Sequence, residues 1–158
     1  MDSGEEAPVE LIGGATGHLI DGYDGIVCDL DGVVYRGRQA IPHAVESLLA
    51  TLAAGVLVVY ATNNASRTPA EVADHLGALG LPGPAERFVT SAQAAAHLVA
   101  RRCPVGSRVL AVGGPGVTLA LTEVGLLVVS PQSIQSAEPV VAVVQGYGAD
   151  VGWADLAE

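Results

Sequence analysis

Apolar runs alternate with amphipathic stretches along most of this chain. Residues 25–30 and 56–61 are nearly continuous apolar runs, which is typical of strands buried in a parallel sheet. Between them, residues 41–55 repeat apolar side chains at helical spacing and end at a glycine, so the pattern predicts a helix. A strand, a helix and a second buried strand in this order favour parallel pairing through a right-handed crossover.

Two capping boxes mark helix starts further along the chain. Thr68 and Glu71, with a proline at the first helical position, form one, and Thr90 and Gln93 form the other. The remaining expected elements are helices over residues 69–80, 91–102 and 117–124, strands over 108–112, 126–129 and 140–144, and the first turns of a helix at 150–158.

These elements predict an α/β protein with a Rossmann-like parallel sheet. The rhythm of the pattern changes around residues 81–88, where prolines and glycine interrupt it. We therefore expect one α/β unit over residues 23–84 and the start of a second over 85–158. Residues 1–22 mix acids with glycines, and we expect them to form a flexible tail.

Composition narrows the possible partners. Half of the 158 residues are apolar, which is ample for a packed core. The 17 acidic residues against 7 basic ones, all arginine, give a net charge of −10, so nucleic acid and anionic membranes would be repelled. Cys28 and Cys103 show no metal-binding or disulfide spacing, and we expect reduced thiols in a cytoplasmic protein.

Polar residues that can do chemistry follow the first two strands. Asp29 and Asp31 end the first apolar run, and Thr62, Asn63 and Asn64 end the second. Ligands of open parallel sheets bind at the carboxyl ends of strands, so these five side chains are the candidate site. A carboxylate at Asp29 can attack phosphorus if a divalent cation screens the charge, and Asp31 can transfer protons. The hydroxyl and amide groups can bind phosphoryl oxygens.

Three stretches also have ordinary structural interpretations. Asp31 and Gly32 could form a hairpin turn with residues 33–35 as the return strand, and this is compatible with an active site. Arg67 could attract an anionic substrate, although a surface arginine before a helix is the usual expectation. Residues 109–116 resemble a dinucleotide fingerprint, but the third glycine is missing, so we predict a glycine turn at a helix start.

The segments DLDGVVYRG and VVYATNNASRT resemble the haloacid dehalogenase superfamily, in its branch of NagD-like phosphatases. The later segments TSAQAAAHL, VLAVGGPG and VVAVVQGY match the same branch, where they open an α/β cap domain. The similarity is in particular to actinobacterial members that dephosphorylate glycerol 3-phosphate and related small phosphates. It implies that residues 23–84 begin the Rossmann-like core and that 85–158 begin a C2-type cap.

The resemblance also implies the roles of the site residues. Asp29 would be the nucleophile and a Mg²⁺ ligand, and Asp31 the acid/base and a Mg²⁺ ligand through its backbone carbonyl. Thr62, Asn63 and Asn64 would hold the phosphoryl group. The implied function is a magnesium-dependent phosphomonoester hydrolase that acts through an aspartyl phosphate. Its partner would be a small phosphorylated metabolite, such as glycerol 3-phosphate or p-nitrophenyl phosphate, and a homodimer is allowed.

The chain departs from this family pattern in three ways. It has no lysine to restrain the nucleophile, and no acidic pair follows a later buried strand to complete the magnesium site. Gly148 stands where family members often carry an acidic residue. We therefore expect the N-terminal portion of a longer enzyme, with negligible turnover by these residues alone. The alternative is a non-catalytic α/β phosphate-binding module or an inactive fragment.

Overall fold

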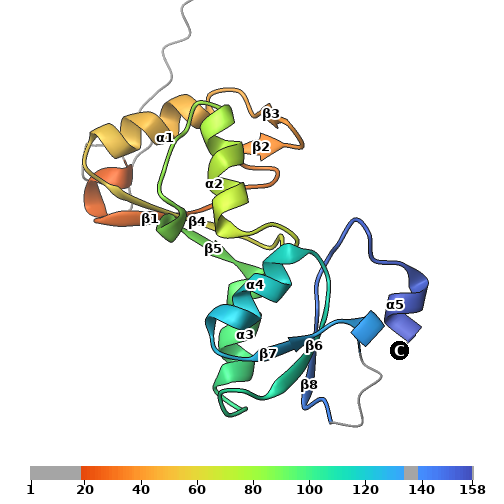
Figure 1. Cartoon of the computed structure of the whole chain (residues 1–158). Coiled ribbons are helices and arrows are strands. Elements are labelled where there is room, and N and C mark those ends of the chain that lie inside the picture. Colours follow the sequence, from red (N-terminus) through yellow and green to blue (C-terminus); the bar gives the residue numbers. More distant parts are fainter. Residues whose placement is uncertain (1–18, 134–138, 158) are drawn as a thin grey trace, which may run out of the picture.

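The computed structural model describes residues 19–133 and 139–157 (Figure 1). The flexible tail expected over residues 1–22 lies outside this part, except for a 3-10 helix at Leu19–Gly22. The described residues form two α/β units, one above the other in Figure 1, and each contains a parallel sheet. The prediction of an α/β fold with parallel strands is confirmed.

The first unit contains a parallel sheet and a small hairpin. The sheet has the order β1-β4-β5, and its strands are parallel. The antiparallel pair β2 and β3 forms a separate flap. The elements are β1 (Gly25–Asp29), β2 (Tyr35–Arg36), β3 (Gln39–Ala40), α1 (Ala44–Ala53), β4 (Leu57–Thr62), α2 (Pro69–Ala78) and β5 (Phe88–Thr90).

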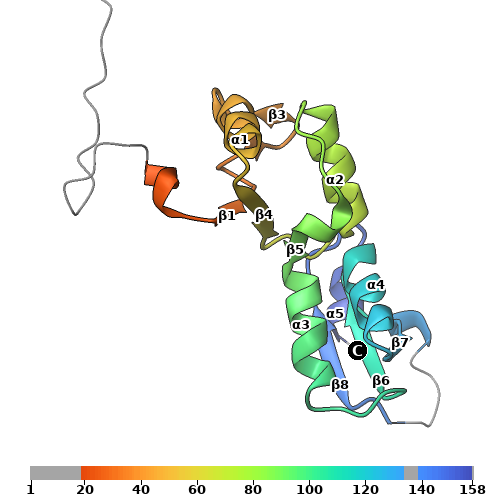
Figure 2. The same cartoon turned by 90° about the vertical axis from the view of Figure 1, so that its left-hand side faces the viewer.

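The second unit begins where β5 runs directly into a helix, as Figure 2 shows. Its parallel sheet has the order β7-β6-β8. The elements are α3 (Ser91–Ala100), β6 (Arg108–Val112), α4 (Pro115–Glu123), β7 (Leu127–Val129), β8 (Ala142–Gln145) and α5 (Trp153–Ala157). Within the described part of the chain, none of the helices has the length and apolar character needed to cross a membrane.

Each of the two parallel sheets packs a face against its helices. In the first unit, Leu48 of α1 and Leu76 of α2 pack over Val58 and Tyr60 of β4. In the second unit, α3 and α4 cover the face that carries the alternate β6 residues Val109 and Ala111. The strand pattern predicted these buried faces because continuous apolar strands need cover to be stable.

The helix starts predicted from capping boxes are confirmed. The Thr68 side chain accepts a hydrogen bond from the Glu71 backbone N–H, and the Glu71 side chain accepts one from the Thr68 N–H. Thr90 and Gln93 make the same reciprocal pair at the start of α3. Each pair satisfies backbone donors that would otherwise lack a partner at the helix end.

The chain after β1 does not form the return strand that residues 33–35 offered as one interpretation of the sequence. The Leu30 carbonyl accepts hydrogen bonds from the N–H groups of Val33, Val34 and Tyr35, so the chain turns tightly without pairing with β1. The hairpin forms later, between β2 and β3. The Ile41 N–H donates to the Val34 carbonyl, which ties residue 41 to the flap, and α1 therefore starts at Ala44 rather than at 41.

The sequence pattern did not predict strand β5. It has three residues and pairs with β4 through Tyr60 opposite Phe88 and Thr62 opposite Thr90. A segment this short carries too little alternation to indicate a strand. The first sheet therefore extends beyond residue 84, while the division of the chain into core and cap stays a prediction.

Candidate active site

The candidate site lies at the carboxyl edge of the first sheet. Strand β1 ends at Asp29 and strand β4 ends at Thr62. The parallel register pairs Asp29 with Ala61, the residue just before Thr62. Neighbouring strands lie about 4.8 Å apart, so the register brings the ends of both predicted motifs to one place.

The two aspartates occupy different backbone settings. Asp29 is the last strand residue, and its Oδ1 accepts a hydrogen bond from the Leu30 backbone N–H at 2.8 Å. Asp31 lies beyond the strand and joins Tyr35 in an isolated β-bridge. Both aspartates are exposed, whereas Leu30 between them is fully buried and anchors the turn. Their carboxylates can therefore reach a ligand without first losing a buried ion pair.

The loop of residues 62–67 begins at the end of β4 and supplies further polar groups at this edge of the sheet. Thr62 is buried, and its Oγ1 accepts a hydrogen bond from the Asn64 N–H at 3.1 Å. Because Oγ1 is the acceptor in that bond, the hydroxyl proton remains available for a phosphoryl oxygen. Asn63 is exposed. The two motifs that the sequence predicted to form a site, at the ends of β1 and β4, thus lie at the same edge of the first sheet.

Asn64 uses its side chain within the loop. Its Oδ1 accepts hydrogen bonds from the backbone N–H groups of Ser66 at 2.8 Å and Arg67 at 3.4 Å. An asparagine that accepts from nearby backbone groups stabilises a turn. The sequence pattern grouped Asn64 with the phosphate-binding residues and did not indicate this local role.

Tyr35 is a residue of the site region that the sequence pattern did not single out. It belongs to the flap, is 5% exposed, and its ring packs edge-on against His75 at 4.6 Å between centroids. Burial raises the pKa of Tyr35; Arg67 lowers it in part, and Asp31 and Asp29 raise it further. The phenol therefore stays neutral at ordinary pH and lies within electrostatic range of both aspartates. In the sequence, the one signal that Tyr35 belongs to the site region is its position four residues after Asp31.

The oxygen atoms at the carboxyl edge of the first sheet are of the chemical type that binds magnesium. Carboxylate and carbonyl oxygens are the ligands that Mg²⁺ prefers, with water filling the remaining octahedral positions. The Asp29 carboxylate and the Asp31 backbone carbonyl are such oxygens, and both aspartates are exposed. Across residues 19–133 and 139–157, no group of three or more histidine, cysteine, aspartate or glutamate side chains could hold a metal ion.

Known proteins are similar to this chain in sequence. The model of the haloacid dehalogenase-like hydrolase family matches residues 26–127. D-glycerol 3-phosphate phosphatase of Mycobacterium tuberculosis is 43% identical over 136 residues, which cover 86% of this chain and 36% of that protein. Acid sugar phosphatase of Staphylococcus saprophyticus is 36% identical over 105 residues, covering 66% of this chain and 40% of the relative.

Solved structures agree with these matches. The crystal structure of glycerol phosphate phosphatase from M. tuberculosis in complex with magnesium has a TM-score of 0.76 and 41% identity, covering 87% of this chain and 40% of its own. NagD from E. coli has a TM-score of 0.68 and 25% identity, covering 85% and 50%. The chain thus spans half or less of the length of these proteins. With the family model matched over residues 26–127, this chain belongs to the haloacid dehalogenase-like hydrolases.

Proposed function

We propose that this chain carries the nucleophile and the phosphate-binding residues of a phosphomonoester hydrolase. Its substrates would be small phosphorylated metabolites such as glycerol 3-phosphate. The observation that carries the proposal is the β1–β4 register, which brings Asp29 beside the start of the 62–67 loop. The relatives named as glycerol 3-phosphate and acid sugar phosphatases support this substrate class.

The first half of the reaction forms a bond between Asp29 and phosphorus. An Asp29 carboxylate oxygen attacks the phosphorus atom as the bond to the leaving alcohol oxygen breaks. The Asp31 carboxyl group donates its proton to that oxygen, so the alcohol leaves neutral. The Thr62 hydroxyl and the amide groups of Asn63 donate hydrogen bonds to the phosphoryl oxygens, where negative charge gathers.

The second half releases inorganic phosphate. The Asp31 carboxylate takes a proton from a water molecule, and the water oxygen attacks phosphorus. The bond between phosphorus and the Asp29 oxygen breaks, which restores the Asp29 carboxylate. Asp31 lies outside the strand, two residues from Asp29. In the proposed reaction it acts on the oxygen that lies across phosphorus from Asp29, first that of the leaving alcohol and then that of the water.

Magnesium would be held by the Asp29 carboxylate and the Asp31 backbone carbonyl, together with water. When bound, it screens the negative charges of the carboxylate and the phosphoryl group from each other. The magnesium complex of the M. tuberculosis phosphatase supports this choice of ion. The present residues supply only part of a six-ligand shell.

We also infer that the first unit is the beginning of a catalytic core and the second the beginning of a cap domain. The chain passes from β5 of the first sheet directly into α3 of the second unit. The match to NagD over 85% of this chain supports the same order of elements. The cap would cover the site and restrict which metabolites enter.

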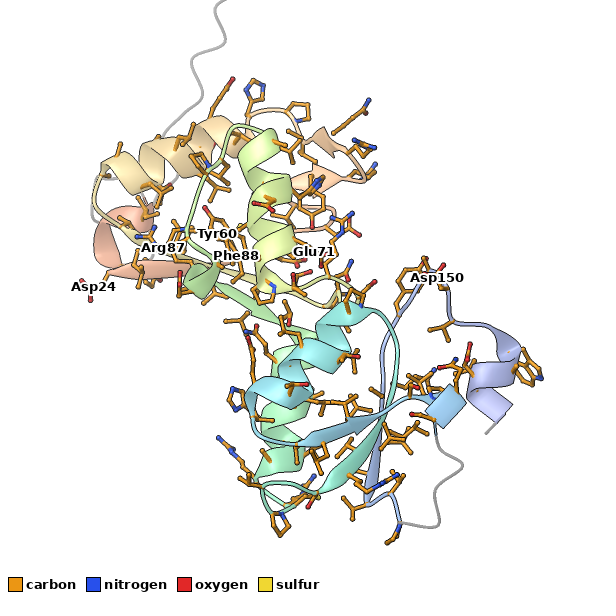
Figure 3. All side chains as sticks on the ribbon, in the orientation of Figure 1. Asp24, Tyr60, Glu71, Arg87, Phe88 and Asp150 are labelled. Atoms are coloured by element: carbon orange, nitrogen blue, oxygen red, sulfur yellow. The ribbon has the colours of Figure 1, made fainter. Side chains whose placement is uncertain are left out.

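The decisive experiment replaces Asp29 in the full-length protein. With p-nitrophenyl phosphate and magnesium, Asp29→Asn should lower kcat by at least about a thousandfold, since removal of a nucleophile is rarely compensated. Asp24→Asn is the matched control because Asp24 is an exposed carboxylate that precedes β1 (Figure 3). It should keep the parent rate. In rapid-quench samples, the parent and Asp24→Asn should carry an acyl phosphate that hydroxylamine removes, and Asp29→Asn should carry none.

Two results would contradict the proposal. If Asp29→Asn hydrolyses the substrate at the parent rate, Asp29 is not the nucleophile. If the parent protein binds phosphate but hydrolyses no phosphomonoester in magnesium, the chain belongs to a non-catalytic phosphate-binding module instead.

A further inference from the structure

The second unit holds the 62–67 loop from outside through two hydrogen bonds. Ser91, the first residue of α3, donates from Oγ to the backbone carbonyl of Asn63 at 2.8 Å. Gly116, in the first turn of α4, donates from its N–H to the backbone carbonyl of Ser66 at 2.9 Å. Figures 1 and 2 both show the start of α4 beneath the lower end of α2, where the two units meet.

The contact leaves no room for side chains at two glycines. A Cβ added at Gly114 would lie 2.7 Å from the Ser66 carbonyl oxygen and 2.8 Å from the Ser66 Cα. A Cβ at Gly116 would collide with the carbonyl oxygens of Ala65 and Arg67. Gly114 has a φ of −76°, a value that any residue can adopt. Close approach of the loop backbone, rather than backbone conformation, therefore requires glycine at residue 114.

An apolar contact joins the same two segments. Ala65, in the middle of the loop, packs against the buried cluster of the second unit. A Cβ added at Gly146, just after β8, would lie 2.7 Å from the Ala65 Cβ. The loop thus contacts α3, α4 and the end of β8 at once. It cannot shift without breaking hydrogen bonds or opening the core of the second unit.

We propose that Ser91 and the Gly114–Gly116 turn are positioning residues that hold the 62–67 loop in its phosphate-binding shape. This inference rests on the proposed function, because it assigns the loop to phosphate. Ser91 binds the carbonyl of Asn63 and not the substrate, so it acts through the loop. Phosphate affinity would therefore depend on how the second unit docks on the first.

The first test replaces Ser91 in the full-length protein. Removing one hydrogen bond of this kind costs about 0.5 to 1.5 kcal/mol. We therefore expect Ser91→Ala to raise KM and the inhibition constant of inorganic phosphate about twofold to twelvefold, at about 1.4 kcal/mol per tenfold. We expect kcat to change less. Ser91→Thr keeps a hydroxyl and should restore both constants. Ser47→Ala, at an exposed position of α1, is the matched control and should leave them unchanged.

The second test adds a methyl group at the contact. Gly116→Ala should push the loop away and weaken phosphate inhibition at least as much as Ser91→Ala does. Gly77→Ala is its matched control, because a Cβ at Gly77 meets no atom within 4 Å. Amide hydrogen exchange gives a readout that needs no turnover. The Ser66 and Arg67 N–H groups should exchange faster in Ser91→Ala and Gly116→Ala than in the controls.

These readouts separate the inference from the proposed function. An inactive parent protein would contradict the proposed function. The positioning role of Ser91 and Gly116 would still be tested by amide hydrogen exchange at Ser66 and Arg67 and by phosphate binding measured with calorimetry. If Ser91→Ala and Gly116→Ala fold and bind inorganic phosphate as tightly as the parent, the inference is wrong. It is equally wrong if loop exchange does not change, or if Ser91→Thr behaves like Ser91→Ala.

Discussion

At the scale of single residues, neighbours in the same motif have different roles. Asn63 is exposed beside the candidate site, whereas Asn64 uses Oδ1 to hold the backbone of Ser66 and Arg67. The sequence placed both after a buried strand and could not separate them. The direction of a side chain depends on the backbone path after the strand, which tertiary contacts fix.

The two asparagines should therefore respond differently to substitution. Asn64→Ala should lower the free energy of unfolding by about 1 kcal/mol, because two loop N–H groups lose their acceptor. Asn64→Asp keeps the acceptor oxygen and should preserve most of the stability. Asn63→Ala should leave stability unchanged and raise KM. Urea denaturation and steady-state kinetics check these outcomes; equal stability of Asn63→Ala and Asn64→Ala would contradict them.

Tyr60 gives a pH-dependent prediction away from the site. It is 2% exposed and stacks on Phe88 with 4.9 Å between ring centroids. Figure 3 labels both residues. Burial raises the pKa of Tyr60 and Cys28 raises it further, while Arg87 lowers it in part. A raised pKa means that the folded state favours the neutral phenol.

The sign of the effect follows from linkage. The stabilising contribution of neutral Tyr60 is fully present below the unfolded tyrosine pKa of about 10 and is lost as pH rises through the higher folded pKa. Urea unfolding measured at about pH 8, 9, 10 and 11 should show the free energy of unfolding falling at the alkaline end. Tyr60→Phe should flatten that fall, and a slope equal to that of the parent would contradict the assignment.

At the scale of elements, local sequence signals located the helices better than the short strands. The capping boxes at Thr68 and Thr90 are confirmed, because a cap is a contact between residues three apart. Strand β5 and the flap hairpin have two or three residues per strand and exist through pairing partners elsewhere in the chain. Their formation could not be predicted from local periodicity.

The cap at Thr68 offers a direct measurement at this scale. Thr68→Ala should lower the free energy of unfolding by about 1 kcal/mol, because the Glu71 N–H loses its acceptor. Thr68→Ser keeps the hydroxyl and serves as the matched control, with a loss below about half of that. Chemical denaturation followed by circular dichroism gives both values. A fully stable Thr68→Ala protein would show that the box contributes nothing.

At the scale of the whole molecule, one face of the first sheet has no helical cover among the described residues. Val27 of β1 is 75% exposed, Leu57 of β4 is 51% exposed, and Val89 of β5 is 47% exposed. In the register, Val27 lies beside Val59, Leu57 beside Gly25 and Val89 beside Ala61. None of these residues belongs to the core cluster, so they lie on the other face of the sheet. Parallel sheets are normally covered on both faces, so this surface favours association with other apolar surfaces.

The 158-residue chain should therefore self-associate through that face. Val27→Thr should weaken association about tenfold, because a buried valine contributes about 1.5 kcal/mol or more. Val105→Thr is the matched control, because Val105 is 83% exposed but precedes β6 and lies outside both sheets. Sedimentation velocity over a range of concentrations measures both. Equal association of Val27→Thr and the parent would exclude the β1 face.

The sequence by itself determined the α/β class, the capped helices and the five candidate residues at the ends of two strands. These features depend on neighbours a few positions apart, where side-chain periodicity and capping geometry are strong. Only the tertiary structure decided the β1–β4 register, the pairing of β5 and the contact of Ser91 and Gly116 with the 62–67 loop. Those contacts join distant segments, and they form only when packing selects one arrangement of the whole chain.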